Sequence, residues 1–560
     1  MNPEYLYLTK SKLEFPLDES IRVLEVADDN EYIVSNSDSC KTQIYAPEIN
    51  FYAQFTQDSI ADKIKNIKSL YDIRSLTFDL AKDMDFEEEV NDKLLIVTDD
   101  EEKDDYKKFL EDKKFASLIL SSDMITDVNG HIGKLIVSID KNGEEYEVEC
   151  AQIIWRDAPS FAMKQSGVFD LSQMSLDEVY ERVKENLSGY RYKNYTIYDE
   201  NICQYHERRE EICGKCVEVC PTVAILKDDE HKHLEFSQID CHGCGGCVSV
   251  CPSGALDFTQ LPRDAFSELK EFYIDKVALI IPRQMDLESL HVELPKDVLP
   301  LAIEGSKFLH ETHFISLLQT SGKSVVFYSD IISKGTGDAI ELINEIFRRK
   351  YDKQAIRIAK NEEELKEALA KTETFSEAKY GINESGLRKR EIFSARLSHL
   401  VGDDDLGVVK TGEHIHYGNI TINTETCTLC MSCVGACNVR ALTAHPEDNT
   451  LRFDPSICTN CGYCEPSCPE KGCLSVIYDE LSLKADYFKQ NVMATDEIFK
   501  CVECGVGFAT KKSIEKIASM MIPVFGDDKE RIRALYCCAD CKPKVTMNAY
   551  LREKTKGKTI

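Results

Sequence analysis

Short apolar runs alternate with helical patterns between residues 270 and 372. The runs predict strands, and the segments between them predict helices because their apolar positions recur every three or four residues. The expected strands are Val277–Ile281, Val298–Ile303, Val325–Tyr328 and Ala355–Ile358, and the expected helices are Phe308–Leu318 and Ala339–Tyr351. Because strands that alternate with helices favour a parallel sheet, we predict a small parallel α/β domain over residues 270–372.

A second set of apolar segments lies between residues 90 and 200. Its expected strands are Leu94–Val97, Ala116–Leu120, Leu135–Ile139 and Glu145–Ile154. The acidic run from Asp99 to Asp105 predicts the start of a helix, since acidic residues favour that end. Asn142-Gly143 favours a type I′ turn and predicts a hairpin. We therefore expect an α/β domain with a hairpin at 90–200, preceded by an N-terminal mixed region, residues 1–89, that the pattern does not place.

Residues 373–415 are polar apart from one amphipathic stretch, Leu387–Leu400. This pattern predicts a connector that contains one packed helix. The alternative is an exposed docking helix with a basic face, formed by Arg388, Lys389, Arg390 and Arg396. A further helix is expected at Lys511–Met521, where apolar positions again recur at helical spacing.

The composition is that of a globular chain with several domains. The chain has 560 residues, which exceeds one ordinary core, and 43% of them are hydrophobic. Its formal charge of −30 disfavours nonspecific binding to nucleic acid or to an anionic membrane. No apolar run approaches the roughly 18 residues of a membrane span, so membrane insertion is not expected. The first 20 residues lack a basic start followed by an apolar stretch, which predicts a cytoplasmic protein.

Cysteine is the most informative residue type, with 24 in the chain. Because the cytoplasm keeps thiols reduced, metal binding is a better explanation than disulfides. Three runs have the spacing C-x2-C-x2-C-x3-C, which is the bacterial ferredoxin signature for a [4Fe–4S] cluster. They consist of Cys241, Cys244, Cys247 and Cys251, of Cys427, Cys430, Cys433 and Cys437, and of Cys458, Cys461, Cys464 and Cys468.

A fourth run, Cys213, Cys216 and Cys220, lacks its first member, because residue 210 is Glu210. The nearest upstream thiol is Cys203. We interpret Cys203 as a displaced ligand, with Gln204–Ile212 forming a bulge. The alternatives are a cluster that lacks one cysteine, such as [3Fe–4S], and a site that uses Glu210 or His206.

The runs form two pairs. Twenty residues separate Cys220 from Cys241, and twenty separate Cys437 from Cys458, which indicates an internal duplication. In the ferredoxin pattern the fourth cysteine of each run binds the neighbouring cluster. The expected ligand sets are therefore crossed. They are Cys203, Cys213, Cys216 and Cys251 for cluster one; Cys241, Cys244, Cys247 and Cys220 for cluster two; Cys427, Cys430, Cys433 and Cys468 for cluster three; and Cys458, Cys461, Cys464 and Cys437 for cluster four.

Both regions resemble bacterial two-cluster ferredoxin domains, over residues 201–262 and 416–482. The resemblance implies a ferredoxin-like fold of ββα repeats around two low-potential clusters that carry single electrons. Cys473 aligns with Ala255 after one inserted residue, so we interpret it as a small apolar residue.

The C-terminal end carries two further C-x2-C pairs, which are Cys501 with Cys504 and Cys538 with Cys541. Two such pairs predict a tetrahedral four-thiolate site in a zinc-ribbon-like knuckle over residues 495–550. Zinc is the expected metal, a rubredoxin-like iron comes second, and a redox dithiol is the alternative. Such a closed site is structural. C-x2-C spacing favours Cys538 over its neighbour Cys537.

The whole layout predicts an α+β multidomain protein. Two further resemblances concern its parts and their order. The block around residues 309–318 resembles the hydrogenase iron–sulfur-subunit domain of heterodisulfide reductases, although Leu309 stands where members of that family often have cysteine. The order of domains resembles the large proteobacterial iron–sulfur proteins associated with formate dehydrogenase. This resemblance implies electron traffic with a molybdenum or tungsten formate dehydrogenase, or help in its maturation.

We expect a cytoplasmic polyferredoxin with four [4Fe–4S] clusters and one zinc that passes electrons to or from a redox partner protein. The alternatives are a maturation factor for such an enzyme and an enzyme with its own substrate site. Gly335-x-Gly337 precedes a helix but lacks the rest of a dinucleotide fingerprint. No catalytic set of residues stands out, so an electron carrier is favoured over an enzyme.

Overall fold

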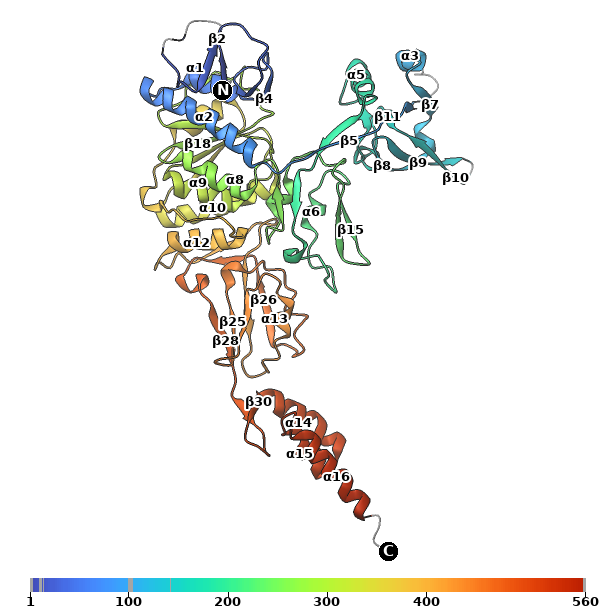
Figure 1. Ribbon diagram of the computed structural model, residues 1–560, viewed down its shortest axis with the longest axis vertical. Coiled ribbons are helices and arrows are strands. Elements are labelled where there is room, and N and C mark those ends of the chain that lie inside the picture. The colour runs from blue at the N-terminus through green and yellow to red at the C-terminus, as the bar shows by residue number, and fades with distance from the viewer. Residues whose placement is uncertain (1–3, 10–12, 14, 99–103, 142, 557–560) are drawn as a thin grey trace. The chain divides into compact units, whose positions relative to one another are not determined.

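The computed structural model describes residues 4–9, 13, 15–98, 104–141 and 143–556 (Figure 1). The chain divides into two compact units, Met1–Leu387 and Arg388–Ile560. The fold is mixed α/β with several parallel sheets.

A four-stranded parallel sheet in the first unit confirms the prediction for residues 270–372. Its strand order is β19-β18-β20-β21, and its strands are β18 (Val277–Pro282), β19 (Val298–Ile303), β20 (Val325–Tyr328) and β21 (Ile356–Ala359). The helices that alternate with them are α9 (Glu311–Ser321), α10 (Lys334–Tyr351) and α11 (Glu362–Ala370). Every residue of β18 is buried, as expected for a central parallel strand.

Residues 1–89, which the sequence pattern does not place, contain a second parallel sheet of order β2-β1-β3-β4. Its strands are β1 (Tyr5–Leu8), β2 (Ile21–Leu24), β3 (Tyr32–Ser35) and β4 (Thr42–Tyr45), followed by α1 (Pro47–Phe55) and α2 (Ile60–Leu80). The buried Arg74 guanidinium on α2 donates to Glu48 at 3.2 Å and to Glu304 at 3.1 Å. This ion pair ties the N-terminal region to the end of β19.

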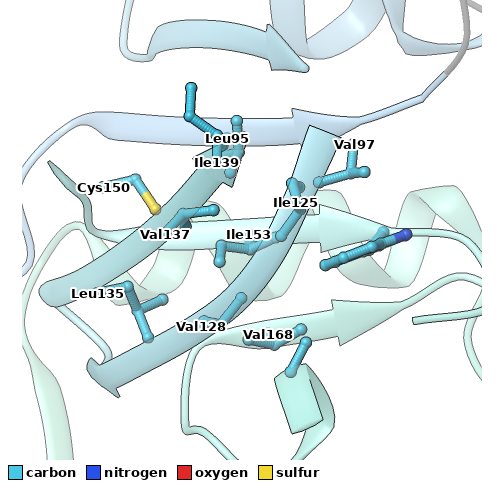
Figure 2. Packing of buried hydrophobic residues seen from close by; sticks show 12 residues of the cluster. Leu95, Val97, Ile125, Val128, Leu135, Val137, Ile139, Cys150, Ile153 and Val168 are labelled. Carbon is cyan, nitrogen blue, oxygen red and sulfur yellow. The ribbon is translucent and has the colours of Figure 1, made fainter. Parts of the chain in front are cut away.

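Residues 90–200 contain a third parallel sheet of order β12-β11-β6-β7 and an antiparallel sheet of order β10-β9-β8. The strands are β6 (Lys93–Val97), β7 (Ala116–Leu120), β8 (Ile125–His131), β9 (Lys134–Lys141), β10 (Glu144–Cys150), β11 (Gln152–Trp155) and β12 (Val168–Asp170). The helices are α3 (Lys107–Glu111), α4 (Ser160–Met163) and α5 (Leu176–Asn186), and β5 (Asp85–Glu88) pairs with β13 (Tyr190–Lys193). Figure 2 shows Val137 of β9 and Ile153 of β11 in the core that joins the two sheets.

One strand prediction in this region is wrong. Glu145–Ile154 is not a single strand, because the chain leaves the hairpin at Ala151 and β11 pairs in parallel with β6. The physical reason is burial: all four residues of β11 are buried, whereas most of β10 is exposed. The hairpin itself pairs Lys141 with Glu144, although Asn142 lies outside the described residues. The helix start at Asp99 also falls on residues that the structure does not describe, 99–103.

The cysteine-rich part of the first unit has two antiparallel pairs and three short helices. The pairs are β14 (Thr196–Tyr198) with β17 (Leu256–Phe258) and β15 (Ile225–Asp228) with β16 (His233–Phe236). The helices are α6 (Lys215–Glu218), α7 (Gly246–Val250) and α8 (Arg263–Leu269).

The second unit repeats this arrangement. Its strands are β22 (Val408–Lys410), β23 (Gly418–Ile422), β24 (Leu442–His445), β25 (Thr450–Phe453), β26 (Leu474–Tyr478), β27 (Glu480–Ser482) and β28 (Asn491–Thr495), with helix α13 (Ser432–Ala436). The β24–β25 hairpin pairs Leu442 with Phe453, just as β15–β16 pairs Ile225 with Phe236. The predicted duplication therefore extends to strand register.

Helix α12 (Lys389–Val401) confirms the predicted helix of the connector. Of the four basic residues expected on the docking face, Lys389, Arg390 and Arg396 lie in this helix and are buried. The alternative of an exposed basic docking face is therefore wrong. Arg390 stacks on the Tyr417 ring at 3.8 Å and donates to the carbonyl of His416, so it serves packing within the unit.

The C-terminal part contains a small β-pair and three helices. They are β29 (Ile498–Lys500), β30 (Gly507–Thr510), α14 (Lys511–Phe525), α15 (Lys529–Leu535) and α16 (Lys542–Lys556). Helix α14 confirms the prediction at Lys511–Met521. Among the described residues, no helix is both long and apolar enough to cross a bilayer.

Candidate metal centres

Left-handed backbone recurs at the same positions of three cysteine loops. The second and fourth residues after the first cysteine have positive φ, and these residues are Gly243 and Gly245, Leu429 and Met431, and Asn460 and Gly462. This alternation curls the loop so that successive cysteines share one side. Leu429 and Met431 adopt φ of 52° and 63° without being glycine, which costs about 1–2 kcal/mol each.

Gly245 has a second role, because a Cβ there would lie 2.4 Å from the Cβ of Phe308. The loop that carries Cys244 therefore rests directly on the parallel α/β domain. A backbone hydrogen bond from Lys307 to the carbonyl of Cys244, at 2.9 Å, fixes the contact. Gly335 allows a similar approach of α10 to Ser249 on α7, which gives Gly335-x-Gly337 a packing role.

A one-turn helix follows two of the loops and separates the third cysteine from the fourth. Cys247 lies in α7 and Cys251 ends it, while Cys433 lies in α13 and Cys437 ends it. The helix turns the fourth thiol away from the first three. This geometry makes crossed ligand sets possible within a small fold.

Two cavities bring together the cysteines that crossed ligation requires. One is lined by Cys241, Cys244 and Cys247 together with Cys220 from the preceding run. The other is lined by Cys427, Cys430 and Cys433 together with Cys468 from the following run. In each cavity the fourth thiol comes from the opposite half of the domain.

The remaining thiols affect one another's pKa values. Burial raises the pKa of Cys213 to about 11, and the neighbouring Cys251 and Cys203 thiols act in the same direction. Burial also raises the pKa of Cys464, as do the thiols of Cys458, Cys461, Cys437 and Cys433. These thiols cannot all ionise next to one another without a compensating positive charge, which iron would supply.

Cys203 has the same local structure as Cys458, the first cysteine of a complete C-x2-C-x2-C-x3-C run. It ends a short 3-10 turn at φ −66° and ψ 134°, and Cys458 ends an equivalent turn at φ −64° and ψ 133°. Asp199 caps the first turn and Asp454 caps the second. The backbone N–H two residues later donates to the sulfur in both cases, at 3.4 Å for Cys203 and 3.3 Å for Cys458.

This likeness has a sequence signal that the cysteine spacing alone does not reveal. Residues 199–203 read Asp-Glu-Asn-Ile-Cys and residues 454–458 read Asp-Pro-Ser-Ile-Cys, so both share Asp-x-x-Ile-Cys. Of the alternative ligands, Glu210 is exposed, and the His206 ring contacts the His233 ring with Nδ1 atoms 3.1 Å apart.

Cys473, which the sequence predicts to be a small apolar residue, is buried in the core of its domain. It also lines the same cavity as Cys427 and Cys468, which the alignment with Ala255 does not reveal. Burial raises its pKa. The cavity therefore contains one thiol more than a cluster needs.

The four C-terminal cysteines converge as the two C-x2-C pairs predict. Cys501, Cys504, Cys538 and Cys541 each offer a sulfur within 4.8 Å of the other three. The Cys504 and Cys538 sulfurs are 3.6 Å apart, close to the edge of about 3.8 Å that Zn–S bonds of about 2.3 Å give in a tetrahedron. This group could bind a metal ion.

Electrostatics at this group favour a bound cation. Burial would raise the pKa of Cys501, but backbone N–H groups of Cys538, Cys504 and Glu503 lower it to about 6. The thiols around Cys541, of which Cys504 has the largest effect, raise the pKa of Cys541 to about 12. Cys537 stays outside the set, because its thiol donates to the carbonyl of Arg533 at 3.4 Å.

Helix α14 links this knuckle to the loop around Cys427. The hydroxyls of Thr510 and Ser513, at the start of α14, each donate to the carbonyl of Thr428 at 2.8 Å. Glu470 accepts from the Thr428 hydroxyl and forms an ion pair with Lys516 of α14. The knuckle thereby buttresses the loop that carries Cys427 and Cys430.

Comparison with known protein families identifies both cysteine-rich regions. A family model described as a 4Fe-4S dicluster domain matches residues 211–255 and 426–472. The chain thus contains two dicluster domains, which imply up to four [4Fe–4S] clusters and electron transfer. The first match begins after Cys203, so it leaves that residue untested. A search of curated proteins finds no match. The likeness to heterodisulfide reductase and to formate dehydrogenase-associated proteins gains no support here.

We predict that Cys203→Ala lowers the iron content of anaerobically purified protein by about four atoms per chain, because cluster one loses a ligand. Cys473→Ala is the matched control, since it removes a buried thiol beside cluster three without removing a ligand. Full iron content in Cys203→Ala, or an equal loss in Glu210→Ala, would contradict the assignment.

We predict that Cys538→Ala abolishes metal binding at the knuckle and speeds amide hydrogen exchange in α14 and at Thr428, because the buttress loosens. The adjacent Cys537→Ala keeps the metal and the slow exchange. Metal analysis and hydrogen-exchange mass spectrometry measure both effects. Equal metal content in the two variants would rule out Cys538 as a ligand.

Proposed function

We propose that this chain is an iron–sulfur electron-transfer protein that passes single electrons to or from an oxidoreductase. The observation that carries the proposal is the crossed grouping of thiols, in which Cys220 joins the loop of Cys241–Cys247 and Cys468 joins that of Cys427–Cys433. Such crossing places two redox sites in one small fold, which suits the relay of electrons. The two dicluster domains provide four such sites.

The proposed ligands of the clusters are the sixteen cysteines of the four crossed sets. Cluster one has Cys203, Cys213, Cys216 and Cys251; cluster two has Cys220, Cys241, Cys244 and Cys247; cluster three has Cys427, Cys430, Cys433 and Cys468; cluster four has Cys437, Cys458, Cys461 and Cys464. When bound, each [4Fe–4S] cluster accepts and releases one electron. The thiols that raise the pKa of Cys216 include the other three of the first set, Cys213, Cys251 and Cys203, along with Cys247 of the second set.

The protein itself shields the cluster sites from water and stabilises their negative charge. Backbone N–H groups that donate to sulfur, as Asn460 does to Cys458, stabilise the more negative state and raise the reduction potential. Most of the cluster thiols are buried or half-buried, but Cys430 is exposed. Electrons would therefore enter or leave most easily at cluster three.

At the knuckle, we propose a structural zinc held by Cys501, Cys504, Cys538 and Cys541. A closed four-thiolate site leaves no position for substrate, so its contribution is mechanical. The hydrogen bonds from Thr510 and Ser513 to Thr428 support this role.

The proposed partner is a cytoplasmic oxidoreductase, and a molybdenum or tungsten formate dehydrogenase is the first candidate to test. The order of domains along the chain motivates that choice. The formal charge of −30 favours a partner with a basic docking surface. Electrostatic steering of this kind weakens as salt rises.

We predict that Cys427→Ser and Cys458→Ser each reduce electron transfer between this protein and formate dehydrogenase at least tenfold, because one relay site is lost. Cys473→Ala keeps the wild-type rate. Anaerobic stopped-flow absorbance measures the transfer, and formate-dependent dye reduction measures the partner alone. The partner's dye activity stays unchanged in every mixture.

Two outcomes would contradict this account. Unaltered transfer in both serine variants would show that the clusters are not the relay. Formate dehydrogenase that lacks dye activity when it is made in cells without this protein would instead favour a role in maturation.

A further inference from the structure

Three potential metal ligands outside the thiol sites meet next to Cys203. They are Glu200, His206 and His233, and one donor atom from each lies within 4.8 Å of the other two. The Nδ1 atoms of the two imidazoles are 3.1 Å apart, and the Glu200 carboxylate lies 3.9 Å from Nε2 of His206. The His206 side chain is only 19% exposed.

The bulge at Gln204–Ile212 delivers His206 to this position. Tyr205 donates its hydroxyl to Asp229 at 2.7 Å, and the backbone N–H of Glu207 donates to the carbonyl of Lys232 at 3.0 Å. Both contacts fasten the bulge to the turn of the β15–β16 hairpin, next to His233. The bulge is thus held in a defined place against that hairpin.

The second dicluster domain offers an internal comparison, because it shares the hairpin but not the ligands. Thr450 occupies the position of His233 in the matching register of β24–β25. Thr424 precedes Cys427 by three residues, as Glu200 precedes Cys203, and only two residues separate Cys427 from Cys430, so this domain has no counterpart of the bulge that carries His206. Cluster binding alone therefore does not require any of the three side chains.

The spacing of the imidazoles suits a metal ion. Two nitrogens at about 2.05 Å from zinc in a tetrahedral site lie about 3.3 Å apart, close to the 3.1 Å between the Nδ1 atoms here. Glu200 has 53% of its side chain exposed, so its carboxylate can move from its place beside Nε2 of His206 towards the two Nδ1 atoms, and one donor atom of each of the three residues already lies within 4.8 Å of the others. A second carboxylate, that of Glu207, lies 3.9 Å from Nε2 of His206.

We propose that Glu200, His206 and His233 bind one divalent transition-metal ion, separate from the sixteen-thiol cluster sites and from the knuckle. Two imidazoles and one carboxylate are a donor set for zinc or ferrous iron, and three protein ligands leave a position open for water or a small ligand. Glu200 and His206 each lie three residues from Cys203, so the ion and cluster one share one segment of chain. The Tyr198 ring lies 6.4 Å from that of His233.

Zinc is the appropriate probe, because a site of this kind binds Zn²⁺ more tightly than Fe²⁺. Anaerobically purified holoprotein is dialysed against micromolar ZnCl₂, and zinc and iron are then counted. We expect wild type to hold one more zinc per chain than His233→Ala or His206→Gln, with the same iron content in all three. His231→Ala is the control, since His231 lies on the same hairpin turn with 73% of its side chain exposed, and it keeps the wild-type zinc count.

The comparison between wild type and variants does not depend on whether the knuckle holds zinc. Equal zinc in wild type and His233→Ala would overturn the proposal. Zinc-edge X-ray absorption of the wild type provides a test without substitutions. We expect nitrogen or oxygen neighbours at about 2.0–2.1 Å besides the sulfur shell of the knuckle, and sulfur neighbours alone would also overturn the proposal.

Discussion

Convergence of four thiols on one small volume is the constraint on which the cysteine-rich half of this structure depends. Neighbouring thiolates repel one another, and burial raises the pKa of Cys433 and Cys458 to about 12 each. The loops also hold Leu429 and Met431 in left-handed backbone at about 1–2 kcal/mol each. Metal binding to four cysteines contributes on the order of 10 kcal/mol in small zinc domains. This is large enough to outweigh both the repulsion between thiolates and the cost of the left-handed backbone. A bound metal therefore explains why such loops exist.

The two dicluster domains hold their cluster loops in place through contacts with different parts of the chain. In the first unit the Cys244 loop rests on Phe308 and Lys307 of the parallel α/β domain. On its other side, Asp240 accepts from both the backbone and the hydroxyl of Ser166. In the second unit the corresponding support comes from the knuckle, through the contacts of α14 with Thr428. The parts without cysteine thus serve as scaffolds that hold cluster loops in place.

The regular elements were predictable where one physical signal dominated. The strands Val298–Ile303 and Val325–Tyr328 match the structure to the residue, because a parallel strand that is buried over nearly its whole length is a continuous apolar run. Residues 1–89 were not predictable, since their four-residue strands carry too little pattern. The predicted strand Glu145–Ile154 failed at Ala151, where the partner strand changes and local periodicity gives no warning. The burial of Arg390 and Arg396 could not be predicted from the sequence either, because long basic side chains are usually exposed.

The candidate sites could be predicted from the spacing of cysteines wherever the ligands are close in sequence. The groups formed by Cys241–Cys247 and by the two C-terminal pairs are of this kind. The contribution of Cys473 to a cavity wall, and the meeting of Glu200, His206 and His233, depend on contacts between separate segments, which spacing does not encode. The Asp-x-x-Ile-Cys likeness between Cys203 and Cys458 was present in the sequence, but its meaning required the matching backbone angles.

The central claim is that each cluster takes three thiols from one half of a dicluster domain and one from the other half. Anomalous diffraction at the iron edge, from crystals grown without oxygen, tests it most directly. The account predicts four iron peaks, with Cys468 at the peak of Cys427–Cys433 and Cys203 at the peak of Cys213, Cys216 and Cys251. A peak bound by all four cysteines of a single run, or no iron near Cys203, would contradict it.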